Sequence, residues 1–162
     1  MTAARAAVLT VSDGVFAGER EDESGTLLGE LLMRDGYGVE RRVVPDDRDA
    51  IAEAIAELAE DADLVLTTGG TGLAPRDVTP EATLDVVERR APGIAEAIRA
   101  DAVAKTSHGL LSRGVAGVRD RTLVVNLPGS PGACRDGFAV LQPALRHALE
   151  LIAGDQTAHR QT

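Results

Sequence analysis

The sequence predicts an α/β fold, a three-layer α/β/α sandwich with a mostly parallel, mixed central sheet. Short apolar runs typical of strands alternate with segments whose apolar residues recur at helical spacing. The turns after the strand candidates carry glycine and aspartate, as in α/β domains whose ligand site lies beyond the carboxyl ends of the strands. With 162 residues, 44% of them hydrophobic, the chain suits one domain, which we place at residues 1–153. We expect the polar tail, residues 154–162, to be flexible.

The first third of the chain predicts two strands, each followed by a polar turn and a helix. The strand candidates are residues 6–11 and 39–44. A polar segment after the first strand, residues 18–25, is expected to be a mobile loop before the first helix. Each helix carries its apolar residues on one face: Leu27, Leu28, Leu31 and Leu32 in the first, and Ile51, Ile55 and Leu58 in the second.

The most informative segment is residues 67–83, TTGGTGLAPRDVTPEAT, which follows a third strand candidate at residues 64–67. Its glycines allow backbone N–H groups to approach a ligand without obstruction by Cβ atoms. Thr79 is expected to cap the next helix and Pro80 to occupy its first position. A phosphate and a metal ion can both bind at such a helix start.

The glycine turn matches neither the phosphate loop that ends in Gly-Lys-Ser/Thr nor the dinucleotide pattern G-x-G-x-x-G. Another way of binding phosphate is therefore required. Taken alone, the glycines are equally compatible with a turn that only connects a strand to a helix.

The last third predicts two more strands and a long helix. Residues 114–118 and 123–126 have hairpin-like spacing, so the sheet is expected to be mixed. Ser130 is the expected N-cap of the last helix. Pro143 should kink or divide that helix, because proline lacks an N–H group and clashes with the preceding turn.

The composition excludes several classes of function. A net charge of −9 without a basic stripe argues against nucleic-acid binding, which draws on clustered Lys and Arg. No run approaches the roughly 18 apolar residues of a membrane helix. An acidic protein that binds a polyphosphate must use backbone amides, a few arginines and a divalent cation. The single cysteine, Cys134, is expected to be a small buried residue, and no secretory segment is evident, so the cytoplasm is the expected location.

Six motifs occur along the chain in an order that resembles the molybdenum-cofactor biosynthesis family. They are Ser12-Asp13, Asp22-x-Ser24-Gly25, Pro45-Asp46, the segment 67–83, Leu111-Ser112-Arg113 and Leu127-Pro128-Gly129-Ser130-Pro131. The family includes bacterial molybdopterin adenylyltransferases of the MogA/MoaB type and the G domains of fusion proteins such as gephyrin. The resemblance covers nearly the whole chain.

The resemblance implies a Mg²⁺-dependent nucleotidyltransferase with ATP and molybdopterin as substrates. The terminal phosphate of molybdopterin would attack the α-phosphorus of ATP, giving adenylylated molybdopterin and pyrophosphate. The nucleophile then belongs to the substrate, which agrees with the lack of any Ser-His or Cys-His constellation.

The resemblance also implies roles for particular residues. Asp46 and Asp77 match the family's two essential carboxylates and are the expected catalytic residues and Mg²⁺ ligands. Nucleotide and phosphate binding is assigned to Asp13, Gly69, Gly70, Thr71, Gly72 and Arg76. Substrate binding is assigned to Ser24, Gly25, Ser112, Arg113, Pro128, Gly129 and Ser130. For Arg76 simple surface exposure, and for Ser130 a purely capping role, remain alternatives.

Other functions stay open on the sequence alone. The main alternative is a non-catalytic or weakly active molybdopterin-binding oligomer of the MoaB type. A structural or regulatory oligomer, and a pyrophosphatase or competence-related relative with the same fold, are further alternatives. The resemblance implies a homotrimer, with a hexamer as the variant, and a transient contact with a separate molybdate-insertion protein. It does not distinguish a molybdenum from a tungsten pathway.

Overall fold

The computed structural model describes residues 3–154, and these contain one mixed six-stranded sheet. Its strand order is β2-β1-β3-β6-β5-β4. The pairs β1–β2, β1–β3 and β3–β6 are parallel, whereas β5 is antiparallel to β4 and to β6. The strands are β1 (Arg5–Val11), β2 (Gly38–Val44), β3 (Leu64–Thr68), β4 (Arg89–Arg90), β5 (Ala116–Arg119) and β6 (Thr122–Leu127). The mostly parallel, mixed sheet predicted from the sequence is confirmed.

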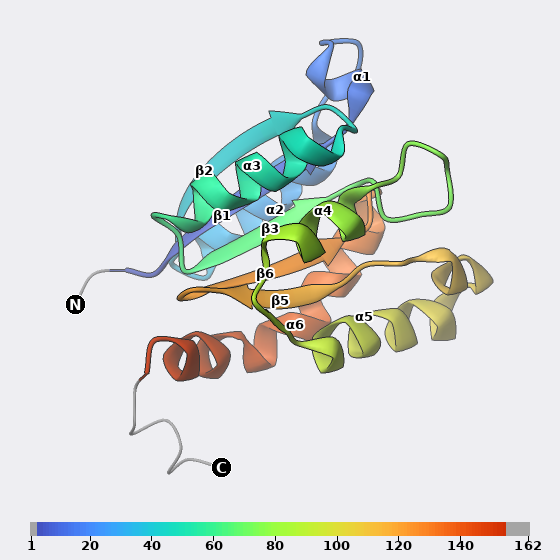
Figure 1. Cartoon of the computed structure of the whole chain (residues 1–162). Coiled ribbons are helices and arrows are strands. Elements are labelled where there is room, and N and C mark those ends of the chain that lie inside the picture. The colour runs from blue at the N-terminus through green and yellow to red at the C-terminus, as the bar shows by residue number, and fades with distance from the viewer. Residues whose placement is uncertain (1–2, 155–162) are drawn as a thin grey trace.

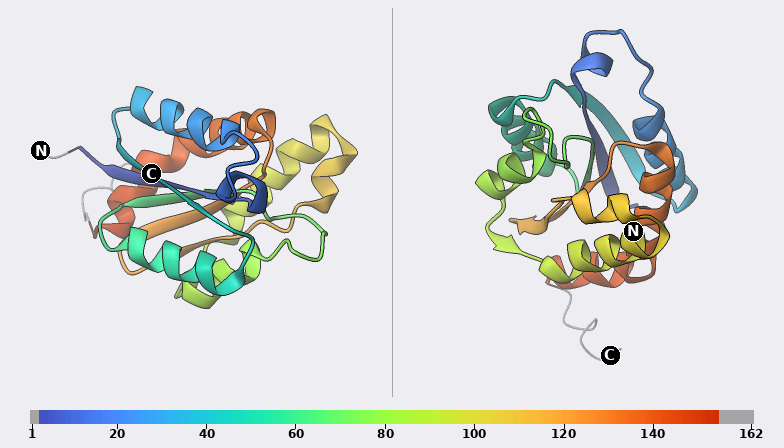
Figure 2. Two further views of the ribbon diagram at one scale, coloured as in Figure 1. Left: turned by 90° about the horizontal axis from the view of Figure 1, so that it is seen from above. Right: turned by 90° about the vertical axis from the view of Figure 1, so that its right-hand side faces the viewer.

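Helices cover both faces of this sheet and complete the three layers (Figure 1 and Figure 2). Helices α2, α5 and α6 pack on one face, and α3 and α4 on the other. The helices are α1 (Asp13–Phe16), α2 (Glu23–Arg34), α3 (Arg48–Ala59), α4 (Thr79–Val86), α5 (Pro92–Lys105), the 3₁₀ turn η1 (Ser107–Leu111) and α6 (Pro131–Ile152).

The two faces of the sheet follow from the alternation of side chains along each strand. In β1, Ala6 and Val8 belong to the core under α2 and α6, while Ala7 and Leu9 belong to the core under α3. Strand β1 is buried on both faces because helices cover it from both sides, as expected for a central parallel strand. On α2, Leu28 and Leu32 are fully buried, which confirms the predicted apolar face.

A prediction about the start of one helix is wrong, and the division predicted for another helix is not present. Thr79 is the first residue of α4 rather than its cap, and its hydroxyl donates to the carbonyl of Gly69 at 2.9 Å. Helix α6 runs from Pro131 to Ile152 without a break at Pro143. Pro143 is exposed, and the buried Phe138 and Leu145 hold the helix against the sheet on either side of it.

The segment expected to be a loop before the first helix is partly helical. It is preceded by α1, a single helical turn that begins at Asp13 and is capped by Ser12. The sequence did not predict this turn. Helix α2 begins at Glu23, so Ser24 and Gly25 lie in its first turn and are buried. Most of the predicted tail, residues 155–162, lies outside the described residues. Between residues 3 and 154, no helix combines the length and apolar character needed to cross a membrane.

Candidate functional site

A cavity of about 430 Å³ opens at the carboxyl end of the sheet. The sheet register explains its position: Val11 of β1 lies opposite Val44 of β2, and Thr68 of β3 opposite Leu127 of β6. Four parallel strands therefore end close together, and the loops that follow them surround the cavity. Its lining residues are Thr10, Val11, Ser12, Val15, Arg20, Glu21, Asp22, Glu23, Ser24, Asp46, Thr68, Gly69, Gly70, Asp77, Gly129, Ser130 and Pro131.

Asp46 and Asp77, the two predicted carboxylates, line this same cavity from different loops. Partial burial raises the pKa of Asp46, and the nearby charges of Asp13 and Asp77 act in the same direction, against the hydrogen bond from the Asp13 amide. The Asp77 carboxylate accepts a hydrogen bond from the Ala74 amide at 3.1 Å, which folds its own loop into a turn. Two carboxylates that face one cavity without a cation pair form an acidic site.

Asp13 and Asp46 fasten the first two loops together by reciprocal hydrogen bonds. The Asp13 amide donates to Asp46 Oδ2 at 3.0 Å, and the Asp46 amide donates to Asp13 Oδ1 at 3.0 Å. Arg76 then donates to both oxygens of Asp13, at 2.7 and 3.0 Å. These contacts with Arg76, together with the Asp46 amide, lower the pKa of Asp13. Asp13 thus bridges two loops, and it does not line the cavity.

The glycine turn after β3 requires glycine for two distinct reasons. Gly69 and Gly70 have φ values of +99° and +68°, which residues with a Cβ atom rarely adopt. A Cβ atom on Gly69 would also collide with the Val11 carbonyl, and one on Gly70 with the Thr79 hydroxyl. The Gly69 amide donates to the Leu127 carbonyl at 3.2 Å and is therefore not available to a ligand.

The next three amides of the turn are better placed for a ligand. Within residues 3–154, the amides of Gly70, Thr71 and Gly72 have no hydrogen-bond acceptor. Helix α6 begins at the same cavity, where the Ser130 hydroxyl accepts from the Ala133 amide at 3.3 Å. Ser130 is therefore a helix cap, as its alternative assignment predicted, while it also lines the cavity.

Asp22, at the start of α2, explains the motif that contains Ser24 and Gly25. Its carboxylate accepts from the Gly25 amide at 3.0 Å, from the Thr10 hydroxyl at 2.9 Å and from Arg41 at 2.8 Å. A Cβ atom on Gly25 would collide with both Asp22 and Thr10. Gly25 is therefore required for packing, whereas the Ser24 hydroxyl lies 3.0 Å from that of Thr68 at the cavity wall.

Ser112 and Arg113 lie beside the glycine turn rather than on the cavity. The Arg113 guanidinium donates to the carbonyls of Gly72 and Asp77 and to the carboxylate of Glu81. The Ser112 hydroxyl accepts from the Gly114 amide at 3.4 Å. Of the other predicted site residues, the cavity is lined by Ser24, Asp46, Gly69, Gly70, Asp77, Gly129 and Ser130, but not by Asp13, Gly25, Thr71, Gly72, Arg76 or Pro128.

The sequence reasoning missed several lining residues, of which Arg20 is the most informative. Arg20 is the one Lys or Arg among the residues that line the cavity. Its side chain passes over Gly14, where a Cβ atom would come within 2.9 Å of Arg20 Cδ. The signal in the sequence was a lone basic residue among four acidic ones, residues 19–23, which we interpreted as part of a mobile loop.

Cys134 lies close to the site but carries no chemistry. It is fully buried in the first turn of α6, as predicted, and its thiol donates to the Pro128 carbonyl at 2.9 Å. Burial raises the pKa of the thiol to about 11, so it stays protonated and unreactive at neutral pH.

The donor set suits Mg²⁺ that is shared with a phosphate ligand. Among the described residues, no cluster of three or more His, Cys, Asp or Glu side chains is placed to hold a metal without help. Mg²⁺ is commonly bound through one or two carboxylates, with water and substrate phosphates completing its shell. Asp46 and Asp77, both hard oxygen donors at one cavity, fit that pattern.

An α/β sandwich with an acidic, glycine-lined cavity at the carboxyl ends of parallel strands defines a class of small-molecule-binding proteins. Comparison with known proteins narrows this class. Residues 7–147 match the family described as "Probable molybdopterin binding domain". The chain belongs to this family, and relatives of the chain are named for molybdenum cofactor synthesis or biosynthesis.

Three relatives illustrate the range of similarity. A molybdopterin adenylyltransferase of Helicobacter pylori strain J99 is 37% identical over 91% of this chain and 87% of its own length. The structure of a molybdopterin biosynthesis enzyme MoaB from Thermus thermophilus is 47% identical, with a TM-score of 0.85 over 93% of this chain and 97% of that one. The Mog protein of Mycobacterium ulcerans is 42% identical, with a TM-score of 0.89 over 93% and 99%.

Other relatives are much longer than this chain. It spans 26% of the cinnamon protein of Drosophila melanogaster and 49% of a bifunctional protein of Chlorobaculum tepidum, both named for molybdenum cofactor synthesis or biosynthesis. The similarity to these proteins therefore concerns one part of each.

Proposed function

We propose that this protein is a molybdopterin adenylyltransferase. It would transfer AMP from ATP to the terminal phosphate of molybdopterin and release pyrophosphate. The observation that carries the proposal is the meeting of Asp46 and Asp77 with the glycine turn and the start of α6 at one cavity. A relative covered over 87% of its own length bears the same name, which supports it further.

In this reaction a phosphate oxygen of molybdopterin forms a bond to the α-phosphorus of ATP, and the bond to the pyrophosphate oxygen breaks. The protein supplies position and charge rather than a nucleophile. The amides of Gly70, Thr71 and Gly72 would donate to phosphate oxygens, and the start of α6 would place further amides near the same charge.

Asp46 and Asp77 would hold Mg²⁺, which when bound neutralises phosphate charge and stabilises the leaving pyrophosphate. Arg20, the cation that lines the cavity, would add charge neutralisation on the side of the cavity formed by the segment before α2. Ser24, Pro128, Gly129 and Ser130 remain our candidates for substrate contacts. For Asp13 and Arg76, an indirect role is consistent with their mutual ion pair.

The second candidate is a molybdopterin-binding oligomer of the MoaB type with little or no adenylyl transfer. Its support is the 47% identity to a protein named MoaB, which exceeds the 42% identity to a protein named Mog. Both candidates use the same fold and the same cavity, so only chemistry separates them.

The first experiment measures pyrophosphate release from ATP and Mg²⁺ under anaerobic conditions, with and without molybdopterin. We expect release that depends on molybdopterin and that falls at least about 100-fold in Asp77→Ala. Asp85→Ala is the matched control, because Asp85 lies in α4, close to Asp77 in the sequence, but pairs with Arg48 outside the cavity. Molybdopterin binding without any release would favour the MoaB-type candidate, and nucleotide monophosphate formed without molybdopterin would favour a pyrophosphatase.

Assembly and location belong to the same proposal. We expect a homotrimer, or a hexamer, in the cytoplasm, which hands its product to a molybdate-insertion protein. Light scattering of the purified protein measures the first of these. A monomer at micromolar concentration would contradict it.

A further inference from the structure

The guanidinium of Arg113 contacts both ends of the loop that runs from the glycine turn to Asp77. Its Nε donates to the Gly72 carbonyl at 2.8 Å, and its Nη2 donates to the Asp77 carbonyl at 2.7 Å. The Arg113 amide also donates to the Thr71 carbonyl, at 2.8 Å. Residues 71–77 are therefore fixed from outside by one residue that is more than 30 positions away in the sequence.

Glu81 fixes the orientation of this guanidinium. Its two carboxylate oxygens accept from Arg113 Nη1 at 2.7 and 3.0 Å. Glu81 lies in the first turn of α4, directly after the loop that carries Asp77. Each of the three guanidinium nitrogens thus donates to protein, two of them to loop carbonyls and one to the helix that follows.

The loop has few other supports. Its residues between Gly72 and Asp77 are exposed, and Leu73 has 65% of its surface accessible. Within the loop, the Ala74 amide contacts the Asp77 carboxylate and the Asp77 amide contacts the Ala74 carbonyl. These internal contacts shape the loop but do not hold it to the rest of the protein, and Figure 1 shows it extending beyond the sheet. Besides Arg113, the loop is tied to α1 by the ion pair of Arg76 with Asp13, but both of those side chains are largely exposed, so solvent weakens that contact.

The position of the loop decides where the Asp77 carboxylate points. The carbonyl that Arg113 contacts belongs to Asp77 itself, and a Cβ atom on Gly72 would come within 2.9 Å of Asp77 Oδ2. The two residues held by Arg113 are therefore the one that bears the carboxylate and the one that packs against it. A loop that shifts by about 1 Å at such a point costs catalysis about 100-fold.

From these contacts we infer that Arg113, oriented by Glu81, is a positioning residue. It holds residues 71–77 so that the Asp77 carboxylate faces the cavity. Its catalytic consequence rests on the proposed function. This inference differs from direct substrate binding, which the family resemblance implied for Arg113. Lysine cannot replace it fully, because an ammonium group cannot reach two carbonyls and a carboxylate with the geometry of a planar fork.

The test compares Arg113→Met and Arg113→Lys with Arg48→Met. Arg48 also forms a bidentate pair with a carboxylate of α4, donating to Asp85 at 2.7 and 2.8 Å, but within residues 3–154 its side chain forms no hydrogen bond to the loop that carries Asp77. Hydrogen–deuterium exchange of a peptide that spans residues 70–80 is measured without substrates. We expect faster exchange in both Arg113 variants, more so in Arg113→Met, and wild-type exchange in Arg48→Met.

Steady-state kinetics provides the second readout. We expect kcat of Arg113→Met to fall about 10–100-fold, as when a residue that orients a catalytic ligand is removed, with KM for molybdopterin close to wild type. Glu81→Gln should change both readouts in the same direction but less. If Arg113→Met does not fold, Arg113→Lys and Glu81→Gln carry the comparison.

Two results would overturn the inference. Unchanged exchange across residues 70–80 would show that Arg113 does not hold the turn. A raised KM for molybdopterin at wild-type kcat would show that it contacts substrate directly. If the wild type itself releases no pyrophosphate, the proposed function fails, while the exchange measurement still decides whether Arg113 holds the turn.

Discussion

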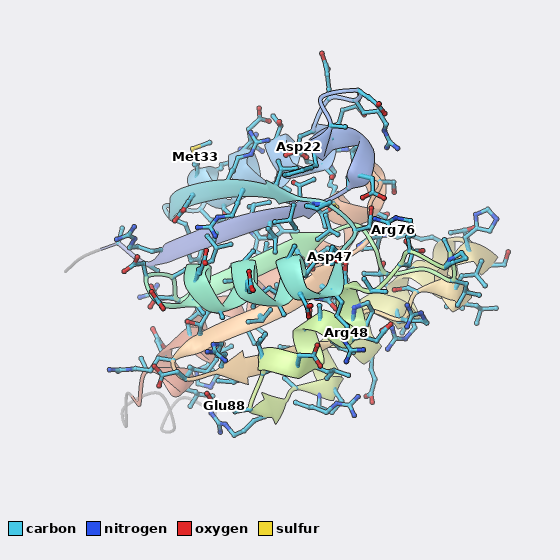
Figure 3. The ribbon with its side chains drawn as sticks, turned by 45° about the horizontal axis from the view of Figure 1, so that its top comes forward. Asp22, Met33, Asp47, Arg48, Arg76 and Glu88 are labelled. Atoms are coloured by element: carbon cyan, nitrogen blue, oxygen red, sulfur yellow. The ribbon has the colours of Figure 1, made fainter. Side chains whose placement is uncertain are left out.

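Four aspartates lie at the cavity or beside it, and two of them differ in surroundings from the other two. Asp13 and Asp22 lie at or before the first turns of α1 and α2 and are each paired with an arginine, Arg76 and Arg41 respectively. Asp46 and Asp77 have no cation pair within the described residues, and both line the cavity, as Asp22 also does. Figure 3 shows Asp22 at the start of α2 and Arg76 on the loop before α4.

The difference separates structural from chemical carboxylates. An aspartate that an arginine already neutralises can fasten loops and cap helices, but it has little charge left for a metal ion. An aspartate left without a cation costs folding free energy when it ionises in a partly buried place. Asp46 accordingly has a raised pKa and Asp13 a lowered one. Such an unfavourable charge is expected where a cation binds during function.

The largest effect should come from removing one unpaired charge. Asp46→Asn keeps the size of the side chain and an oxygen that can accept from the Asp13 amide, but removes the charge. We expect pyrophosphate release to fall at least about 100-fold. Mg²⁺ should raise the thermal midpoint of the wild type and not that of the variant, because only a site that binds the ion is stabilised by it. Equal stabilisation of both proteins by Mg²⁺ would contradict the assignment of Asp46.

The same variant gives a signed prediction for stability against pH. The pKa of Asp46 is raised in the folded state above its ordinary value of 3.8. Its stabilising contribution is therefore fully present below pH 3.8 and is lost as the pH rises through the folded-state pKa. At pH 7 we expect Asp46→Asn to be at least as stable as the wild type, and the difference to vanish in acid. Urea denaturation at several pH values measures it, and a less stable variant at pH 7 alone would argue against this sign.

Replacing Asp22, an aspartate that is paired with an arginine, should lower the stability of the protein at pH 7 instead of leaving it unchanged or raising it. Asp22→Ala removes the N-cap of α2 together with the contacts to Thr10 and Arg41. We expect a loss of about 2 kcal/mol in the free energy of unfolding, since a helix cap and a partly buried hydrogen bond are lost together. Arg41→Met, which removes only the half-exposed ion pair, should cost less. Thermal denaturation compares the two, and equal losses would mean that the cap contributes little.

The sequence predicted the fold well because its signals are local. Apolar runs marked β1, β2, β3 and β6, and helical spacing marked α2, α3 and α6. The short α1 and the two-residue β4 escaped because neither carries a hydrophobic period. Thr79 was misassigned because a threonine before a proline is typical of a helix cap. In the structure its hydroxyl instead donates a hydrogen bond to the Gly69 carbonyl.

The site was predicted less completely than the fold. Asp46, Asp77, Gly69 and Gly70 lie in the loops that follow strands, so the parallel topology places them near the cavity without further information. The role of Arg113 depends on contacts between segments more than 30 residues apart, which no local pattern encodes. Arg20 lies in a charged run whose ordinary interpretation is a solvated surface.

The smallest effect is expected at the exposed pair between Arg76 and Asp13. Arg76→Met removes both hydrogen bonds to Asp13, but the two side chains are 65% and 47% exposed, so solvent screens most of the interaction. The Asp13 pKa is lowered in the folded state, and its contribution is present above 3.8 and lost as the pH falls through the folded-state value.

The variant should therefore have a slightly lower thermal midpoint than the wild type at pH 7, and this difference should vanish in acid. Arg48→Met, which breaks another exposed bidentate pair, is the matched control for stability. A clear rise in KM for ATP in Arg76→Met, absent in the control, would instead mean that Arg76 leaves Asp13 to neutralise phosphate. In that case the distinction between paired and unpaired aspartates would depend on whether nucleotide is bound.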